Sequence, residues 1–93
     1  RKRNPDRAKM KLHETFPLKI FTPFQTFFEG EALALSAVNK TGPFDILAKH
    51  EDFLSILVPC SVVVQTTAGK KEFPLERGII QVNKDQVWVF ANI

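Results

Sequence analysis

Cysteine and histidine are scarce in this sequence, and their scarcity limits the chemistry that the chain can support. Its 93 residues include one cysteine, Cys60, and two histidines, His13 and His50. A single cysteine excludes an internal disulfide, and these three residues cannot close a structural zinc site without several carboxylates. The chain also lacks an apolar run of the roughly 18 residues that a membrane-spanning helix needs. No apolar run follows the basic N-terminus, so we predict no signal peptide.

The motifs that most enzymes need are also missing. No glycine-rich run precedes a Gly-Lys-Ser or Gly-Lys-Thr sequence, which excludes a phosphate-binding loop of that type. The consecutive residues His50, Glu51 and Asp52 carry the donor atoms of a hydrolytic zinc site. Consecutive residues on a strand point to opposite faces, however, so three in a row seldom converge on one ion. A nucleophilic pair of Cys60 and His50 lacks a recognisable orienting residue. We therefore predict no catalytic residue, no metal and no cofactor.

Positive charge is concentrated at the N-terminus. Residues 1–11 contain six basic residues and one acid, a net charge of +5, whereas the whole chain carries +3 and the other 82 residues carry −2. Basic arms are typical of proteins that bind nucleic acids or anionic lipids, but residues 1–11 hold no aromatic side chain on which a base could stack. We expect residues 1–15 to form a flexible, solvated arm and residues 16–93 to form one domain with a modest core.

Short runs of β-branched and aromatic residues, separated by turn residues, indicate strands throughout that domain. No window of a dozen residues has the apolar spacing of a helix. Segment 50–57 fits either a strand or a short helical turn, so both interpretations stay open. The predicted strands are residues 18–22, 25–29, 31–38, 44–47, 61–67, 70–75, 77–82 and 86–92. This many short strands with short connections favours an all-β antiparallel sandwich or barrel.

Several predicted strands have apolar side chains on both faces. In the last strand, Val87, Val89 and Ala91 lie on one face, while Trp88 and Phe90 lie on the other. A strand of a self-contained sandwich normally alternates apolar and polar side chains. Either the domain is rolled so tightly that both faces are buried, or another protein covers one outer face.

Three segments occur in an order that resembles a known family. Thr22-Pro23 ends one predicted strand and Phe28-Glu29-Gly30-Glu31 lies in the next, "GPFDILAKHEDFL" spans 42–54, and "FPLERGIIQVNKDQVWVFA" spans 73–91. Together they resemble the N-terminal domain of the epsilon subunit of F-type rotary ATP synthases, which is called delta in mitochondria. The resemblance covers residues 16–93.

This resemblance implies a flattened antiparallel β-sandwich of about ten short strands, without catalysis or a cofactor. It implies a rotor component of the central stalk that links the gamma subunit to the membrane c-ring in proton-driven ATP synthesis. It further implies no nucleic-acid partner and a peripheral position on the cytoplasmic face of the bacterial inner membrane, or on the equivalent face of another coupling membrane. Many epsilon subunits also have a C-terminal helical hairpin that can brake ATP hydrolysis, and the resemblance does not extend to it.

The sequence departs from the family in the loop expected to face the ring. The acidic residue that the family often has in this loop is replaced by Pro43. The family's histidine is kept as His50, but the glycine before it is Lys49, and the small residues after it are replaced by acids. Two other functions remain open: a divergent sandwich that acts as a protein-interaction module outside the synthase, and a small nucleic-acid-binding β domain, which the basic arm and nine phenylalanines favour. The predicted subunit-interface residues are Phe44, His50, Glu51, Asp52, Trp88 and Phe90.

Overall fold

The computed structural model describes residues 14–92, which form nine strands. No helix occurs in this range, and hence none that could span a membrane. The predicted arm, residues 1–15, lies outside the described residues except for its last two positions. The strands are β1 (Phe16–Phe21), β2 (Thr26–Ala32), β3 (Ala34–Asn39), β4 (Gly42–Leu47), β5 (Phe53–Leu57), β6 (Cys60–Thr66), β7 (Gly69–Leu75), β8 (Gly78–Asn83) and β9 (Gln86–Ala91).

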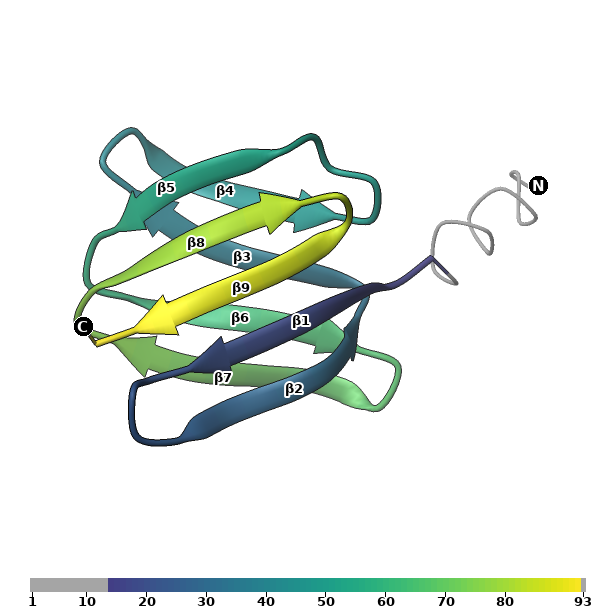
Figure 1. The fold of residues 1–93 in the computed structure, drawn as a ribbon, viewed down its shortest axis with the longest axis horizontal. Helices are drawn as coiled ribbons and strands as arrows, with labels where there is room; N and C mark the ends of the chain where they lie inside the picture. The colour runs from purple at the N-terminus through teal and green to yellow at the C-terminus, as the bar shows by residue number, and fades with distance from the viewer. Residues whose placement is uncertain (1–13, 93) are drawn as a thin grey trace, which may run out of the picture.

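The strands stack in two layers, as Figure 1 shows. The front layer runs in the order β2-β1-β9-β8-β5, and the back layer contains β4, β3, β6 and β7. A single bridge between Asn39 of β3 and Leu57 of β5 joins the layers. All pairs are antiparallel except β1 with β9, which run parallel. The predicted all-β sandwich is confirmed, with nine strands in the described range instead of about ten and with one parallel pair.

The core lies between the layers and receives side chains from every strand. Alternate residues of each strand point inward, so β9 buries Val87, Val89 and Ala91 as the pattern predicted. The parallel register places Leu18 beside Val87 and Ile20 beside Val89, and all four side chains are at most 2% exposed. The first and last strands of the domain therefore pair at the centre of the front layer.

Two segments differ from the sequence prediction. The run 31–38 is not one strand, because the chain turns at Leu33, whose N–H donates to the carbonyl of Gln65 at 2.7 Å. Ala32 ends β2 with its side chain in the core, and Ala34 begins β3 in the other layer. Of the two interpretations of segment 50–57, the structure selects a strand, β5, which pairs with β8.

Candidate functional site

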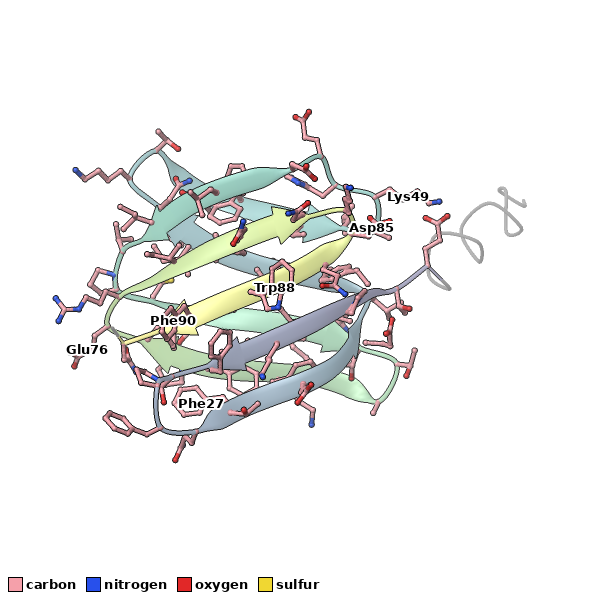
Figure 2. The ribbon with its side chains drawn as sticks, in the orientation of Figure 1. Phe27, Lys49, Glu76, Asp85, Trp88 and Phe90 are labelled. Carbon is pink, nitrogen blue, oxygen red and sulfur yellow. The ribbon has the colours of Figure 1, made fainter. Side chains whose placement is uncertain are left out.

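The side of the front layer that faces away from β3, β4, β6 and β7 is called the outer face here. Trp88 and Phe90 project from β9 onto this face (Figure 2), and both side chains are half-buried. Within residues 14–92, no further layer of strands covers these two side chains (Figure 1). The strand β9 pairs only with β1 and β8, which both belong to the front layer. The sequence left two explanations for strands with apolar side chains on both faces: a tightly rolled domain or a partner that covers the outer face. The first explanation fails for β9, because the domain itself does not bury both faces of this strand.

An apolar row crosses the outer face. The register aligns Ile56 of β5 with Ile79 of β8, and Ile79 with Phe90 of β9. Phe90 then stacks on Phe21 of β1, with ring centroids 5.0 Å apart and planes 17° apart. Ile56 is 71% exposed and Leu54 on the same strand is 68% exposed. A continuous set of large apolar side chains that water can reach is the usual mark of a protein-interaction surface.

The neighbouring row on the outer face is more polar and surrounds Trp88. Gln81 lies opposite Trp88 on one side, and Lys19 lies opposite it on the other, followed by Glu29 on β2. The Lys19 ammonium sits 5.1 Å from the centre of the Phe21 ring, a distance at which a cation is attracted by the ring face. The outer face thus has an apolar centre bordered by charges of both signs, as protein interfaces often have.

Of the four other predicted interface residues, His50, Glu51 and Asp52 lie in the loop 48–52 at one end of the sandwich, and Phe44 lies in β4, the strand before this loop. Phe44 is half-buried and its ring lies 5.4 Å from that of Phe53, which in turn lies 5.6 Å from the ring of His50. Phe44 is therefore linked to His50 of the loop through Phe53. Glu51 and Asp52 are both exposed. The structure thus divides the six predicted residues between the outer face and this loop end.

The loop is attached to the turn that joins β8 to β9. The Asp52 carboxylate accepts a hydrogen bond from the Lys84 N–H at 3.0 Å, and the Asp85 carboxylate accepts one from the Lys49 N–H at 2.8 Å. Figure 2 shows Lys49 and Asp85 next to each other at this end of the molecule. Sequence reasoning missed Lys49, Lys84 and Asp85, because their partners lie 32 and 36 residues away along the chain.

Sequence reasoning also missed part of the outer face. Leu54 and Ile56 lie in segment 50–57, for which a strand and a short helical turn were both left open, and the structure shows both side chains facing solvent on β5. Phe21 and Ile79 were assigned to strands, but the sequence did not indicate that their side chains lie on the outer face. The sequence of β5, Phe-Leu-Ser-Ile-Leu, is apolar on both faces and gave no clear signal. Only the structure shows that Phe53, Ser55 and Leu57 are less exposed than the two residues between them.

The residues 50–52 do not converge on a common point. His50 Nδ1 lies 2.7 Å from the carbonyl oxygen of Glu51, while the Asp52 carboxylate points to the β8–β9 turn. Within residues 14–92, no three His, Cys, Asp or Glu side chains lie close enough together to hold a metal ion. The arrangement at this end can bind another macromolecule through hydrogen bonds and charges.

Comparison with known proteins agrees with this architecture. The protein-family model for the β-sandwich domain of the ATP synthase delta/epsilon chain matches residues 15–93. The ATP synthase epsilon chain of Clostridium novyi is 40% identical over 80 residues, which are 85% of this chain and 61% of that relative. The chain thus spans about three fifths of the length of that relative.

Two solved structures share the fold at low sequence identity. A chain of the mitochondrial ATP synthase of Euglena gracilis superposes with a TM-score of 0.78 at 19% identity, over 86% of this chain and 52% of that one. A chain in the central stalk and c-ring structure of the Tetrahymena thermophila mitochondrial ATP synthase gives a TM-score of 0.68 at 18% identity, over 80% of this chain and 62% of that one. Because the family model covers nearly the whole domain, the chain belongs to the ATP synthase delta/epsilon family, of which it forms the β-sandwich domain.

Proposed function

We propose that this chain is a non-catalytic component of the rotor of an F-type ATP synthase, where it joins the gamma subunit to the membrane c-ring during proton-driven ATP synthesis. The observation that carries the proposal is the apolar row on the outer face, in a domain that belongs to the delta/epsilon family. A soluble monomer seldom leaves such a continuous set of large apolar side chains without a partner.

In this proposal the outer face binds the gamma subunit. Trp88 and Phe90 are large aromatic side chains at the centre of this face. A few large aromatic residues supply most of the binding energy in many protein interfaces. A groove of about 660 Å³ beside Leu54 and Ile56, bordered by the β3–β4 turn, extends the surface toward the sheet edge. The ring-facing position of the family corresponds to Pro43 at the start of β4, so in this proposal the β3–β4 turn meets the c-ring.

The mechanical role follows from the fold. Asn39, beside the β3–β4 turn, pairs with Leu57 of β5, and β5 pairs through β8 with β9, which carries Trp88 and Phe90. Both proposed contact surfaces therefore belong to one hydrogen-bonded sheet, which can hold two partners at a fixed distance. The chain would lie at the periphery of the coupling membrane as part of the complex, on the cytoplasmic face if the membrane is a bacterial inner membrane.

Replacement of both outer-face aromatic residues tests the gamma contact. Trp88→Ser with Phe90→Ser should weaken binding of the chain to the gamma subunit about thirtyfold or more, since truncated interface anchors cost ~2 kcal/mol or more. The measurement is a titration against purified gamma subunit. A thermal melt accompanies it, because loss of the Phe21 stacking partner should lower domain stability by about 1 kcal/mol.

A matched control lies on the opposite side of the molecule. Val63 is also half-buried and also points outward, but from β6 of the back layer. Val63→Ser should leave gamma binding within about twofold. If the outer-face variant binds gamma as the unmodified chain does, the outer face is not this interface. If the unmodified chain fails to co-purify with gamma, the interaction module outside the synthase is favoured instead.

A further inference from the structure

Two adjoining hollows at one end of the outer face combine apolar walls with positive charge. The groove beside Leu54 and Ile56 includes Lys40 of the β3–β4 turn among its lining residues. A second hollow of about 330 Å³ adjoins it, because Ile56 and Ile79 line both, and its charged member is Arg77 of the β7–β8 turn. Lys40 and Arg77 are both exposed. Among the described residues that line these two hollows, none is acidic.

This positive border is a local feature and does not follow from the overall charge. Residues 12–93 carry a net charge of −2. Around Trp88, on the same face, both signs occur, since Lys19 and Glu29 lie in the same row of the sheet. Glu76, the sequence neighbour of the arginine, lines neither hollow. The outer face is therefore mixed in charge around the tryptophan and positive around the two hollows.

Both cations lie in turns that an asparagine fixes to a neighbouring segment. At the β3–β4 turn, Asn39 Nδ2 donates to Ser55 Oγ of β5 at 3.0 Å. Its Oδ1 accepts from the N–H and the hydroxyl of Thr41, at 2.9 Å and 2.7 Å, so the bonds enclose the lysine between them. At the β7–β8 turn, the Asn92 N–H donates to the Arg77 carbonyl at 2.7 Å. The backbone on which each cation stands is thus ordered before a partner arrives, which lowers the entropy that binding costs.

We propose that the two hollows receive a segment of the gamma subunit in which large apolar side chains are flanked by aspartate or glutamate. The identity of the partner rests on the proposed function. Leu54 and Ile56 are 68% and 71% exposed, so an apolar segment seated on them removes a large apolar area from water. Lys40 and Arg77 supply the selectivity, because a basic segment would place like charges opposite each other, which is costly at an interface.

The hollows are continuous with the surface that we assign to gamma. Ile79 lines both hollows and lies opposite Phe90 in the strand register, at the centre of the outer face. The groove is also bordered by the β3–β4 turn, which in the proposed function meets the c-ring. The c-ring is therefore the alternative occupant, and the experiment has to measure the binding of both partners.

Charge reversal in the full chain tests the proposal. Lys40→Glu with Arg77→Glu should reduce affinity for the purified gamma subunit at least about tenfold at low ionic strength, because attraction becomes repulsion. Added salt should weaken gamma binding less in this variant than in the unmodified chain, since salt screens the attraction that the variant has lost. The exchange Lys40→Arg with Arg77→Lys keeps both charges and should retain most of the affinity. A thermal melt of each variant verifies that the domain is folded.

The matched control changes the net charge by the same amount at a distant place. Lys70 and Lys71 are exposed lysines at the start of β7, in the back layer. Lys70→Glu with Lys71→Glu should leave gamma affinity within about twofold. Equal losses in the two reversed variants would mean that gamma responds to the overall charge of the chain, which overturns the proposal.

The other results that would overturn the proposal are distinct. Unchanged gamma affinity with weakened c-ring binding in the Lys40→Glu, Arg77→Glu variant means that the ring occupies the hollows. Tighter gamma binding in that variant means that the segment is basic. A loss in the charge-keeping exchange as large as in the reversal means that shape is recognised and not charge. An unmodified chain that does not bind gamma refutes the proposed function itself, a result that is obtained before any variant is compared.

Discussion

Lys49 shows how a single residue can keep a backbone conformation that its side chain opposes. The family resemblance places a glycine at this position, and the φ angle of 64° explains why glycine suits it. Lys49→Gly should raise the free energy of unfolding by about 0.5 kcal/mol, because relief of the left-handed strain exceeds the entropy that glycine adds to the unfolded chain. Urea denaturation of both forms measures the difference, and the bond to Asp85 is kept because glycine retains the N–H.

Lys40 provides the control for that substitution. It is another exposed lysine in a turn, but its φ angle is not among the positive ones. Lys40→Gly should therefore lower stability by up to about 1 kcal/mol, since glycine brings only its entropic cost. Equal shifts in the same direction at both positions would show that backbone strain at Lys49 is not the cause.

Gly78 is constrained by space and not by its dihedral angle. A Cβ atom at this position would lie 2.9 Å from the carbonyl oxygen of Phe90, a distance that real structures do not tolerate. Gly78→Ala should push β8 away from β9 and cost about 2 kcal/mol of stability. Gly30 offers a contrast, because its nearest foreign atom, on the Phe28 ring, would be at an ordinary 3.6 Å. Gly30→Ala should change stability by less than about 0.5 kcal/mol in the same denaturation assay, and a comparable loss at both sites would argue against the close approach.

At the scale of the strands, sequence pattern predicted most elements but not how they associate. Eight of the nine strands coincide with predicted runs, because alternation and turn residues are local properties. β5 was left ambiguous because Phe53, Leu54, Ile56 and Leu57 are apolar on both faces, which hides the period of two. The parallel pairing of β1 with β9 could not be predicted, since it joins segments at opposite ends of the domain.

The candidate surfaces were predictable to a similar degree. Trp88 and Phe90 were identified because two large aromatic residues on the polar face of a strand need an explanation, and the structure places both on the outer face. The loop residues were identified through a family motif. Their bonds to the β8–β9 turn depend on tertiary contacts, which no local pattern encodes, so the role of Asp52 within the molecule emerged only from the fold.

At the scale of the whole molecule, the two proposed surfaces belong to one hydrogen-bonded sheet. The β3–β4 turn is joined to the front layer where Asn39 pairs with Leu57 of β5. β5 pairs through β8 with β9, which carries Trp88 and Phe90 on the outer face. β9 also pairs with β1, so the outer face is built on a central pair of strands within the same sheet (Figure 1). A component that holds two partners in register requires this kind of direct connection, and a flexible linker between the surfaces would not supply it.

The shared core predicts that the domain unfolds as one unit. Every strand contributes to a single buried cluster, and Ile20 lies fully buried at the seam between β1 and β9. Ile20→Ala should cost about 3 kcal/mol, a large part of the roughly 5–15 kcal/mol that holds a small domain together. Trp88 fluorescence and far-UV ellipticity should nevertheless lose their native values at the same urea concentration. Phe24→Ala is the control, because that side chain is 93% exposed and its loss should shift the midpoint little. If Trp88 responds at lower urea than the ellipticity does, β9 detaches before the rest of the sheet, and the sandwich could not hold the two partners rigidly.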